Sequence, residues 1–118
     1  AGFAVRTFGG QHALIHPSIP VIANVGFLIE ESVYHPGDSL FVPPVPVRTL
    51  LLPIHAPWNK GAEVIDFAIS VRAPVVHQIH DGLLQGAGIS LLEGLIVRVA
   101  GPHGVDFRRW ADGDTVTS

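Results

Sequence analysis

The chain has 118 residues, 47% of them hydrophobic, which is enough apolar material for the core of a single domain covering residues 1–118. Its net charge of −3 and its few, mostly scattered basic residues cannot line a phosphate track, so we expect no nucleic-acid partner. No apolar stretch is as long as a membrane span, and the start lacks the order of a signal peptide, so we expect a cytoplasmic protein without a membrane partner.

Two residue types are absent from the chain, cysteine and methionine. Without cysteine, disulfides and thiolate metal ligands are excluded, and histidine and carboxylate side chains remain as the strong metal donors. Without methionine the chain as written has no initiator residue. We therefore expect a processed or excised piece of a longer protein.

The first predicted element is a strand at residues 2–8, where apolar and other side chains alternate before Gly9-Gly10. His12 and His16 follow it, four residues apart. On a helix this spacing would place both imidazoles on one face as metal ligands, but prolines at 17 and 20 argue against a long helix. We expect a loop, with one functional histidine and one surface histidine.

A hairpin is predicted next, with an apolar strand at 25–29, a turn at Glu30-Glu31 and a second strand from residue 32 to Tyr34. The turn Tyr34–Ser39 then places Asp38 at the carboxyl end of that second strand. A carboxylate there can bind a metal, act as a base or cap the next turn, and capping is the commonest role of an isolated Asp.

The rest of the chain predicts an extended Pro-rich linker and then alternating strands and helices. We expect the linker at 41–46, strands at 49–54 and 75–80, helices at 60–73 and 89–99, and a short edge strand at 105–110. The order of these elements predicts an α/β fold with a mixed sheet and helices on one face. The second helix should bury Ile89, Leu92, Ile96 and Val99.

Three loops that follow strands carry polar side chains suited to metal binding: His12 and His16, Asp38, and His80 with Asp81. Ligands of α/β sheets tend to bind outside the carboxyl ends of the strands, so these side chains can meet. Two imidazoles and a carboxylate would suit zinc, iron or manganese. With seven histidines in the chain, an innocent combination remains the alternative.

Four stretches in this order resemble the second half of a metallo-β-lactamase-fold hydrolase. They are Gly-Gly-Gln-His-Ala, Val-Gly-Phe-Leu-Ile with Val-Tyr-His-Pro-Gly-Asp-Ser, Leu-Leu-Leu-Pro-Ile-His-Ala-Pro-Trp, and Val-Val-His-Gln-Ile-His-Asp-Gly-Leu-Leu. The resemblance implies half of a four-layer αβ/βα sandwich whose first half, carrying the His-x-His-x-Asp-His metal motif of the family, is missing from this sequence.

The resemblance also implies site residues, matched motif by motif. His12 matches a metal-binding histidine, Asp38 the catalytic acid that bridges two metals, and His80 the last metal-binding histidine. His35, Asp81 and His16 are expected around these ligands, with Asp81 fixing the loop beneath His80 and His16 a weaker alternative to His12. His55 and His77 depart from the family pattern and are not expected to bind metal. Trp58 suits either a pocket wall or the core, and we favour the core.

The activity that the resemblance implies is hydrolysis of a small-molecule substrate by a metal-bound hydroxide, with a divalent metal, zinc or alternatively iron or manganese. Three donors are only part of such a site, so we expect this half to be inactive alone. The alternative is a non-catalytic half-sandwich that serves as a binding or assembly module. In either case one sheet face lacks cover, which predicts a homodimer or a missing N-terminal half as the partner.

Overall fold

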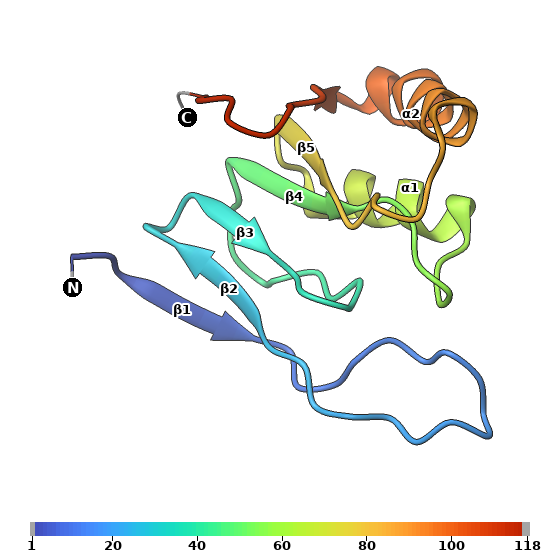
Figure 1. Cartoon of the computed structure of the whole chain (residues 1–118). Coiled ribbons are helices and arrows are strands. Elements are labelled where there is room, and N and C mark those ends of the chain that lie inside the picture. Colours follow the sequence, from blue (N-terminus) through green and yellow to red (C-terminus); the bar gives the residue numbers. More distant parts are fainter. Residues whose placement is uncertain (1, 117–118) are drawn as a thin grey trace.

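Six strands form a single sheet in which they lie in the same order as in the sequence (Figure 1). The computed structural model describes residues 2–116. The strands are β1 (Val5–Phe8), β2 (Gly26–Ile29), β3 (Val33–His35), β4 (Thr49–Pro53), β5 (Val75–Ile79) and β6 (Asp106–Phe107), with helices α1 (Gly61–Val71), α2 (Gly86–Ala100) and the short 3₁₀ helix η1 (Gly101–His103).

The sheet is mixed, because β1, β2 and β3 are antiparallel neighbours whereas β3, β4, β5 and β6 are parallel. The β2–β3 hairpin turns at Glu30 and Glu31, which both have positive φ, of 53° and 51°. Helix α1 connects β4 to β5, and α2 connects β5 to β6. Since β1 is antiparallel to β2, and β2 to β3, strands β1, β3, β4 and β5 all point the same way, and their carboxyl ends share one edge.

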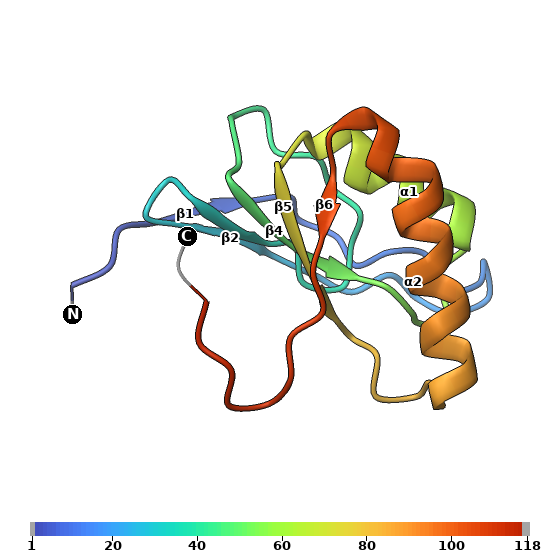
Figure 2. The same cartoon turned by 90° about the horizontal axis from the view of Figure 1, so that it is seen from above.

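Both helices pack on one face of the sheet and form the core with it (Figure 2). Leu50 and Leu52 of β4 and Val76 of β5 are fully buried, and Leu51 between the first two is only partly covered. This alternation is what the pleat of a strand produces when one face is buried. The helices contribute further buried side chains to this core, namely Val64, Ile65, Phe67, Ala68 and Val71 from α1 and Ile96 and Ala100 from α2.

The opposite face of the sheet has different cover at its two ends. Over β5, Trp110 from the segment after β6 stacks on His77 with ring centroids 4.5 Å apart and planes 9° apart. Over β1 and β2, Val5 and Phe27 remain 50% and 43% exposed. The C-terminal segment therefore covers the β5 end of this face, while the β1–β2 end is apolar and open.

The predicted strands and helices are confirmed, with differences at their ends. Helix α1 ends at Val71 because Arg72 adopts a left-handed conformation with φ of 60°, two residues before Pro74. Helix α2 begins three residues earlier than predicted, and the prediction that Val99 is buried was wrong, since it is 42% exposed. The last strand comprises only Asp106–Phe107 of the predicted 105–110.

Within residues 2–116, the helices are all too short or too polar to cross a bilayer.

Candidate functional site

The carboxyl edge of the sheet brings His12 and His80 to Asp38. His12 lies in the loop after β1, Asp38 in the turn after β3, and His80 directly after β5. The Nε2 atom of His12 is 3.6 Å from Oδ2 of Asp38, and the Nε2 atom of His80 is 3.3 Å from Oδ1. The two imidazoles therefore face different oxygens of one carboxylate, although the three residues are far apart in the sequence.

Both distances are longer than the roughly 2.7–2.9 Å of a charge-assisted N–H···O hydrogen bond. They are close to the separation of about 3.3 Å between two ligand atoms of a tetrahedral zinc site, which follows from zinc–ligand bonds of about 2.0–2.1 Å. The side chains of His12, His80 and Asp38 are 14%, 35% and 46% exposed. The carboxylate thus remains open to solvent between two better covered rings.

The ring of His12 is oriented by a hydrogen bond on the side away from Asp38. Its Nδ1 lies 2.6 Å from the carbonyl oxygen of Ala13, and because a carbonyl can only accept, Nδ1 carries the proton. In the neutral ring Nε2 then carries no proton, and its lone pair faces the Asp38 carboxylate. This orientation leaves Nε2 available as a donor atom on the side of the carboxylate.

The turn that carries Asp38 is held by Asn24, a residue that sequence analysis did not single out. The backbone N–H of Asp38 donates to Oδ1 of Asn24 at 2.9 Å, and Nδ2 of Asn24 donates to the carbonyl of Pro36 at 3.0 Å. Gly37, between them, has a φ of +70°, and a Cβ there would collide with the Asn24 amide. Only glycine therefore suits this position, for reasons of both conformation and space.

The loop of His12 is tied directly to the Asp38 turn. The backbone N–H of Ala13 donates to the carbonyl of Asp38 at 2.8 Å. Trp58, in the loop after β4, contacts both imidazoles edge-on, with ring centroids 5.8 Å from His12 and 6.0 Å from His80. Trp58 is only partly buried, so the expectation that it lies in the core is wrong, and it forms a wall of the site instead.

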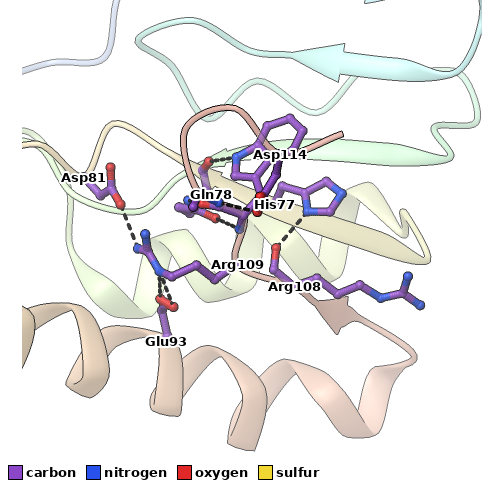
Figure 3. A network of polar contacts seen from close by, with 9 residues as sticks. His77, Gln78, Asp81, Glu93, Arg108, Arg109 and Asp114 are labelled. Carbon is purple, nitrogen blue, oxygen red and sulfur yellow. Dashed lines mark hydrogen bonds and ion pairs between the residues drawn. The ribbon is translucent and has the colours of Figure 1, made fainter. Parts of the chain in front are cut away.

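His80 occupies an unusual backbone conformation, with a φ of 62°. Such a left-handed conformation costs a non-glycine residue about 1–2 kcal/mol, so the neighbouring structure must hold it. Asp81, the next residue, accepts a hydrogen bond from Nη2 of Arg109 at 2.7 Å, and Nε of Arg109 also binds both carboxylate oxygens of Glu93 on α2 (Figure 3). Sequence analysis missed Arg109 and Glu93, because neither their spacing nor their residue types point to this loop.

Partial burial disfavours the charge of Arg109, but the hydrogen bonds to Glu93 and Asp81 outweigh this effect and raise its pKa above the usual value. The guanidinium therefore stays charged, and it joins the His80 loop, helix α2 and the C-terminal segment.

The other predicted histidines have contacts of their own. His35 accepts a hydrogen bond on Nδ1 from the N–H of Gly37 at 3.0 Å, and so supports the Asp38 turn from within. Burial lowers the pKa of His35, an effect that the nearby Asp38 partly opposes. His16 is exposed and contacts Ser18 at 2.7 Å, away from the carboxylate. His77 is buried under Trp110 and donates through Nδ1 to the carbonyl of Arg108, 2.7 Å away.

The donors around Asp38 suit a divalent cation in kind but are too few to enclose one. Among residues 2–116, no three His, Cys, Asp or Glu side chains form a group that could hold an ion. Each imidazole faces its own oxygen of the Asp38 carboxylate, at 3.6 Å for His12 and 3.3 Å for His80. The arrangement therefore supplies one nitrogen and one oxygen donor at each of two positions.

No known family profile matches the chain. The chain is similar to Protein Rv0786c of Mycobacterium tuberculosis, with 45% identity over 86 residues, a match that covers 66% of this chain and 41% of that protein. The chain thus spans less than half the length of this relative.

Proposed function

We propose that this chain is the C-terminal half of a metal-dependent hydrolase of the metallo-β-lactamase superfamily, acting on a small-molecule substrate and incomplete in its metal site. The observation that carries the proposal is the position of the Asp38 carboxylate between Nε2 of His12 and Nε2 of His80, at 3.6 Å and 3.3 Å. A carboxylate that offers one oxygen to each of two histidines is suited to bridge two cations.

In this proposal His12, His80 and Asp38 would hold divalent cations, with zinc as the first candidate and iron or manganese as alternatives. When bound, such cations would make a water molecule acidic enough to serve as the nucleophile near neutral pH. The protein's own residues set the geometry. The Ala13 carbonyl fixes the His12 ring, Asn24 fixes the Asp38 turn, and Trp58 covers one side of both rings.

Each cation would still lack donors, because a structural or catalytic zinc has at least three protein ligands and this chain offers two per position. The remaining donors would come from an N-terminal half. The length of Protein Rv0786c, of which the match covers 41%, leaves room for such a half in that relative.

The test is a comparison of Asp38→Asn with Asp66→Asn, a variant at an exposed position of α1. Both proteins are made from the complete reading frame that encodes this chain, and are assayed with zinc against ester, lactam and phosphodiester substrates. Loss of a residue that only supports a metal ligand lowers activity or metal affinity roughly 10–100-fold, and we expect the losses in Asp38→Asn to be larger. Asp66→Asn should keep both the activity and the bound metal. Metal content equal to the wild type in Asp38→Asn, measured by elemental analysis, would contradict the proposal.

A second candidate function, an assembly module that forms a homodimer, is favoured by the open part of the sheet face. A cavity of about 480 Å³ on this face is lined by Val5, Val25, Phe27, Ile29, His35 and Gly37, which are almost entirely apolar. A second copy related by a twofold axis would present the same apolar side chains to it. Light scattering at micromolar concentration distinguishes the two states, and a monomer that Phe27→Glu leaves unchanged would contradict the homodimer.

A further inference from the structure

We infer that Arg109 is a positioning residue for His80, which it holds in its strained conformation through the neighbouring Asp81. This inference rests on the proposed function insofar as it assigns His80 a metal. It goes beyond that function because it assigns a role to residues of helix α2 and of the C-terminal segment, both outside the edge where the donors meet.

The guanidinium of Arg109 contacts two carboxylates at once. Nη2 of Arg109 donates to Oδ2 of Asp81 at 2.7 Å, while Nε lies 2.8 Å and 2.7 Å from the two oxygens of Glu93 (Figure 3). One planar group thus binds two carboxylates from separate elements. A lysine ammonium is a point charge without this fork, so it would not hold both in the same way.

The contacts of Arg109 are partly protected from water. The side chains of Arg109, Asp81 and Glu93 are 36%, 28% and 16% exposed. The neighbouring pair of Arg108 and Asp106, in contrast, is 62% and 53% exposed. Fully solvated ion pairs contribute little, and partly buried pairs that form a network contribute more, so Arg109 has an effect that Arg108 lacks.

The C-terminal segment that carries Arg109 is itself anchored on strand β5. Trp110 donates its backbone N–H to Oε1 of Gln78 at 3.1 Å and accepts from Nε2 of Gln78 at 2.7 Å. Its indole Nε1 donates to the Gln78 carbonyl at 3.1 Å, and its ring stacks on His77. Gln78 lies two residues before His80 on β5, so the segment is anchored on the same strand that leads into the loop.

His80 has a strained backbone conformation. Its φ of 62° persists only where surrounding contacts determine it. Within the loop, the N–H of Leu84 donates to the carbonyl of Asp81 at 3.0 Å, which closes a turn directly after His80. Arg109 holds the side chain of Asp81 from outside this turn. Without it, the loop loses its connection to α2 and to the C-terminal segment, and His80 Nε2 is no longer fixed at Asp38.

The experiment compares Arg109→Gln with Arg108→Gln, which removes the same charge from the adjacent residue and breaks an ion pair with Asp106. Amide hydrogen exchange is measured on the metal-free protein made from the complete reading frame that encodes this chain, and Co²⁺ binding to the same protein is measured by calorimetry and by its visible spectrum. We expect Arg109→Gln to speed exchange of the Leu84 amide at least about 10-fold and to weaken Co²⁺ binding about 10–100-fold. Arg108→Gln should change neither by more than about twofold.

The sign of the Co²⁺ effect separates positioning from simple electrostatics. Removing a positive charge and leaving two carboxylates unpaired should strengthen cation binding if charge alone mattered. Weaker binding in Arg109→Gln therefore supports positioning, and unchanged or stronger binding overturns it. If Arg109→Gln exposes the β5 amides as well, Asp81→Asn replaces it for the exchange measurement alone, since this variant keeps the shape of the side chain but removes a negative charge, which by itself weakens cation binding.

Failure of the proposed function gives a different result. A wild-type protein made from the complete reading frame that binds no Co²⁺ counts against the metal site, and the role of Arg109 is then decided by exchange alone. Faster exchange at Leu84 with unchanged exchange in β5 supports it, and equal exchange in Arg109→Gln and Arg108→Gln overturns it.

Discussion

The turn that carries Asp38 and the loop that carries His80 end at the same point of the molecule but are fixed by different forces. The Asp38 turn is held by uncharged hydrogen bonds from Asn24 and by a glycine whose conformation other residues avoid. The His80 loop is held by ion pairs through Arg109. The first should therefore respond to side-chain volume and hardly to salt, whereas the second should respond to salt and charge and little to volume.

The largest expected effect is on the Asp38 turn. Gly37→Ala places a methyl group against the Asn24 amide and forces a non-glycine residue into φ of +70°, so we expect a loss of about 2–4 kcal/mol in the free energy of unfolding. Urea denaturation measures it. Gly104→Ala is the matched control, because φ there is +87° but nothing lies within 4 Å of the added carbon. If the two variants lose equal stability, the close approach of Asn24 contributes nothing.

The next effect comes from Tyr34, which leads into the same turn and donates its hydroxyl to the carbonyl of Phe41 at 2.8 Å. Burial raises the pKa of Tyr34 to about 12, above its unfolded value of 10.0. The unfolded chain therefore releases this proton first, so the stabilisation is complete below pH 10 and is lost as the pH rises through 12. A shift of this size corresponds to about 2–3 kcal/mol. Denaturation of the wild type and of Tyr34→Phe between pH 9 and pH 12 checks it, and parallel pH profiles would contradict it.

A smaller effect is expected from Asn24→Ala, which leaves the N–H of Asp38 without its acceptor and removes one of the two donors to the carbonyl of Pro36, the other being Oγ of Ser39 at 3.2 Å. Pro36 is buried but its carbonyl keeps the Ser39 donor, and Asp38 is only partly buried, so we expect a loss of about 1–2 kcal/mol. Asn24→Asp keeps the acceptor for Asp38 and loses the donor to Pro36, and should lie between the alanine variant and the wild type. Thermal and urea unfolding of the three proteins give the order of their stabilities. A different order would show that the two hydrogen bonds of the Asn24 amide do not stabilise the turn in the way proposed.

The smallest effect concerns salt. Raising NaCl from about 0.1 M to 1 M shortens the Debye length from roughly 10 Å to 3 Å and should weaken the Arg109 contacts. We expect faster hydrogen exchange at the Leu84 amide and unchanged exchange at the Asp38 amide, which donates to an uncharged side chain. Equal responses of the two amides would mean that the turn and the loop are held by the same kind of force.

The sequence allowed the order of strands and helices to be predicted because local signals mark each element. Apolar runs such as 49–54 and 75–80 are buried strands, and the pattern at 60–73 is a helix that ends before Pro74. The buried face of α2 was predicted less well, because Val99 fits an apolar stripe that begins at Ile89 whereas the helix turns Ile96 and Ala100 toward the sheet. Periodicity alone does not say which of two apolar stripes faces the core.

The candidate site was predictable only where a residue type has a chemistry of its own. His12, Asp38 and His80 were singled out because they can bind a metal and follow strands, and the sheet places them together. Their roles as ligands remain a prediction. Asn24 and Arg109 could not be found in this way, since an amide and a guanidinium occur in many unrelated contexts and their partners lie 14 and 28 residues away. Trp58 was misplaced because an aromatic residue suits a core and a pocket wall equally.

The order of the strands in the sheet has a consequence for how the molecule is assembled. Every strand pairs with the one that precedes it in the sequence, from β1 to β6. No gap is left for a later segment to fill, so the sheet can extend one strand at a time as the polypeptide emerges from the ribosome. Each new pairing closes only the loop or helix just made, which keeps its entropic cost low. The contacts that fix Arg109 come from the segment after β6, so the edge where His12, Asp38 and His80 meet reaches its final geometry only after that segment has docked.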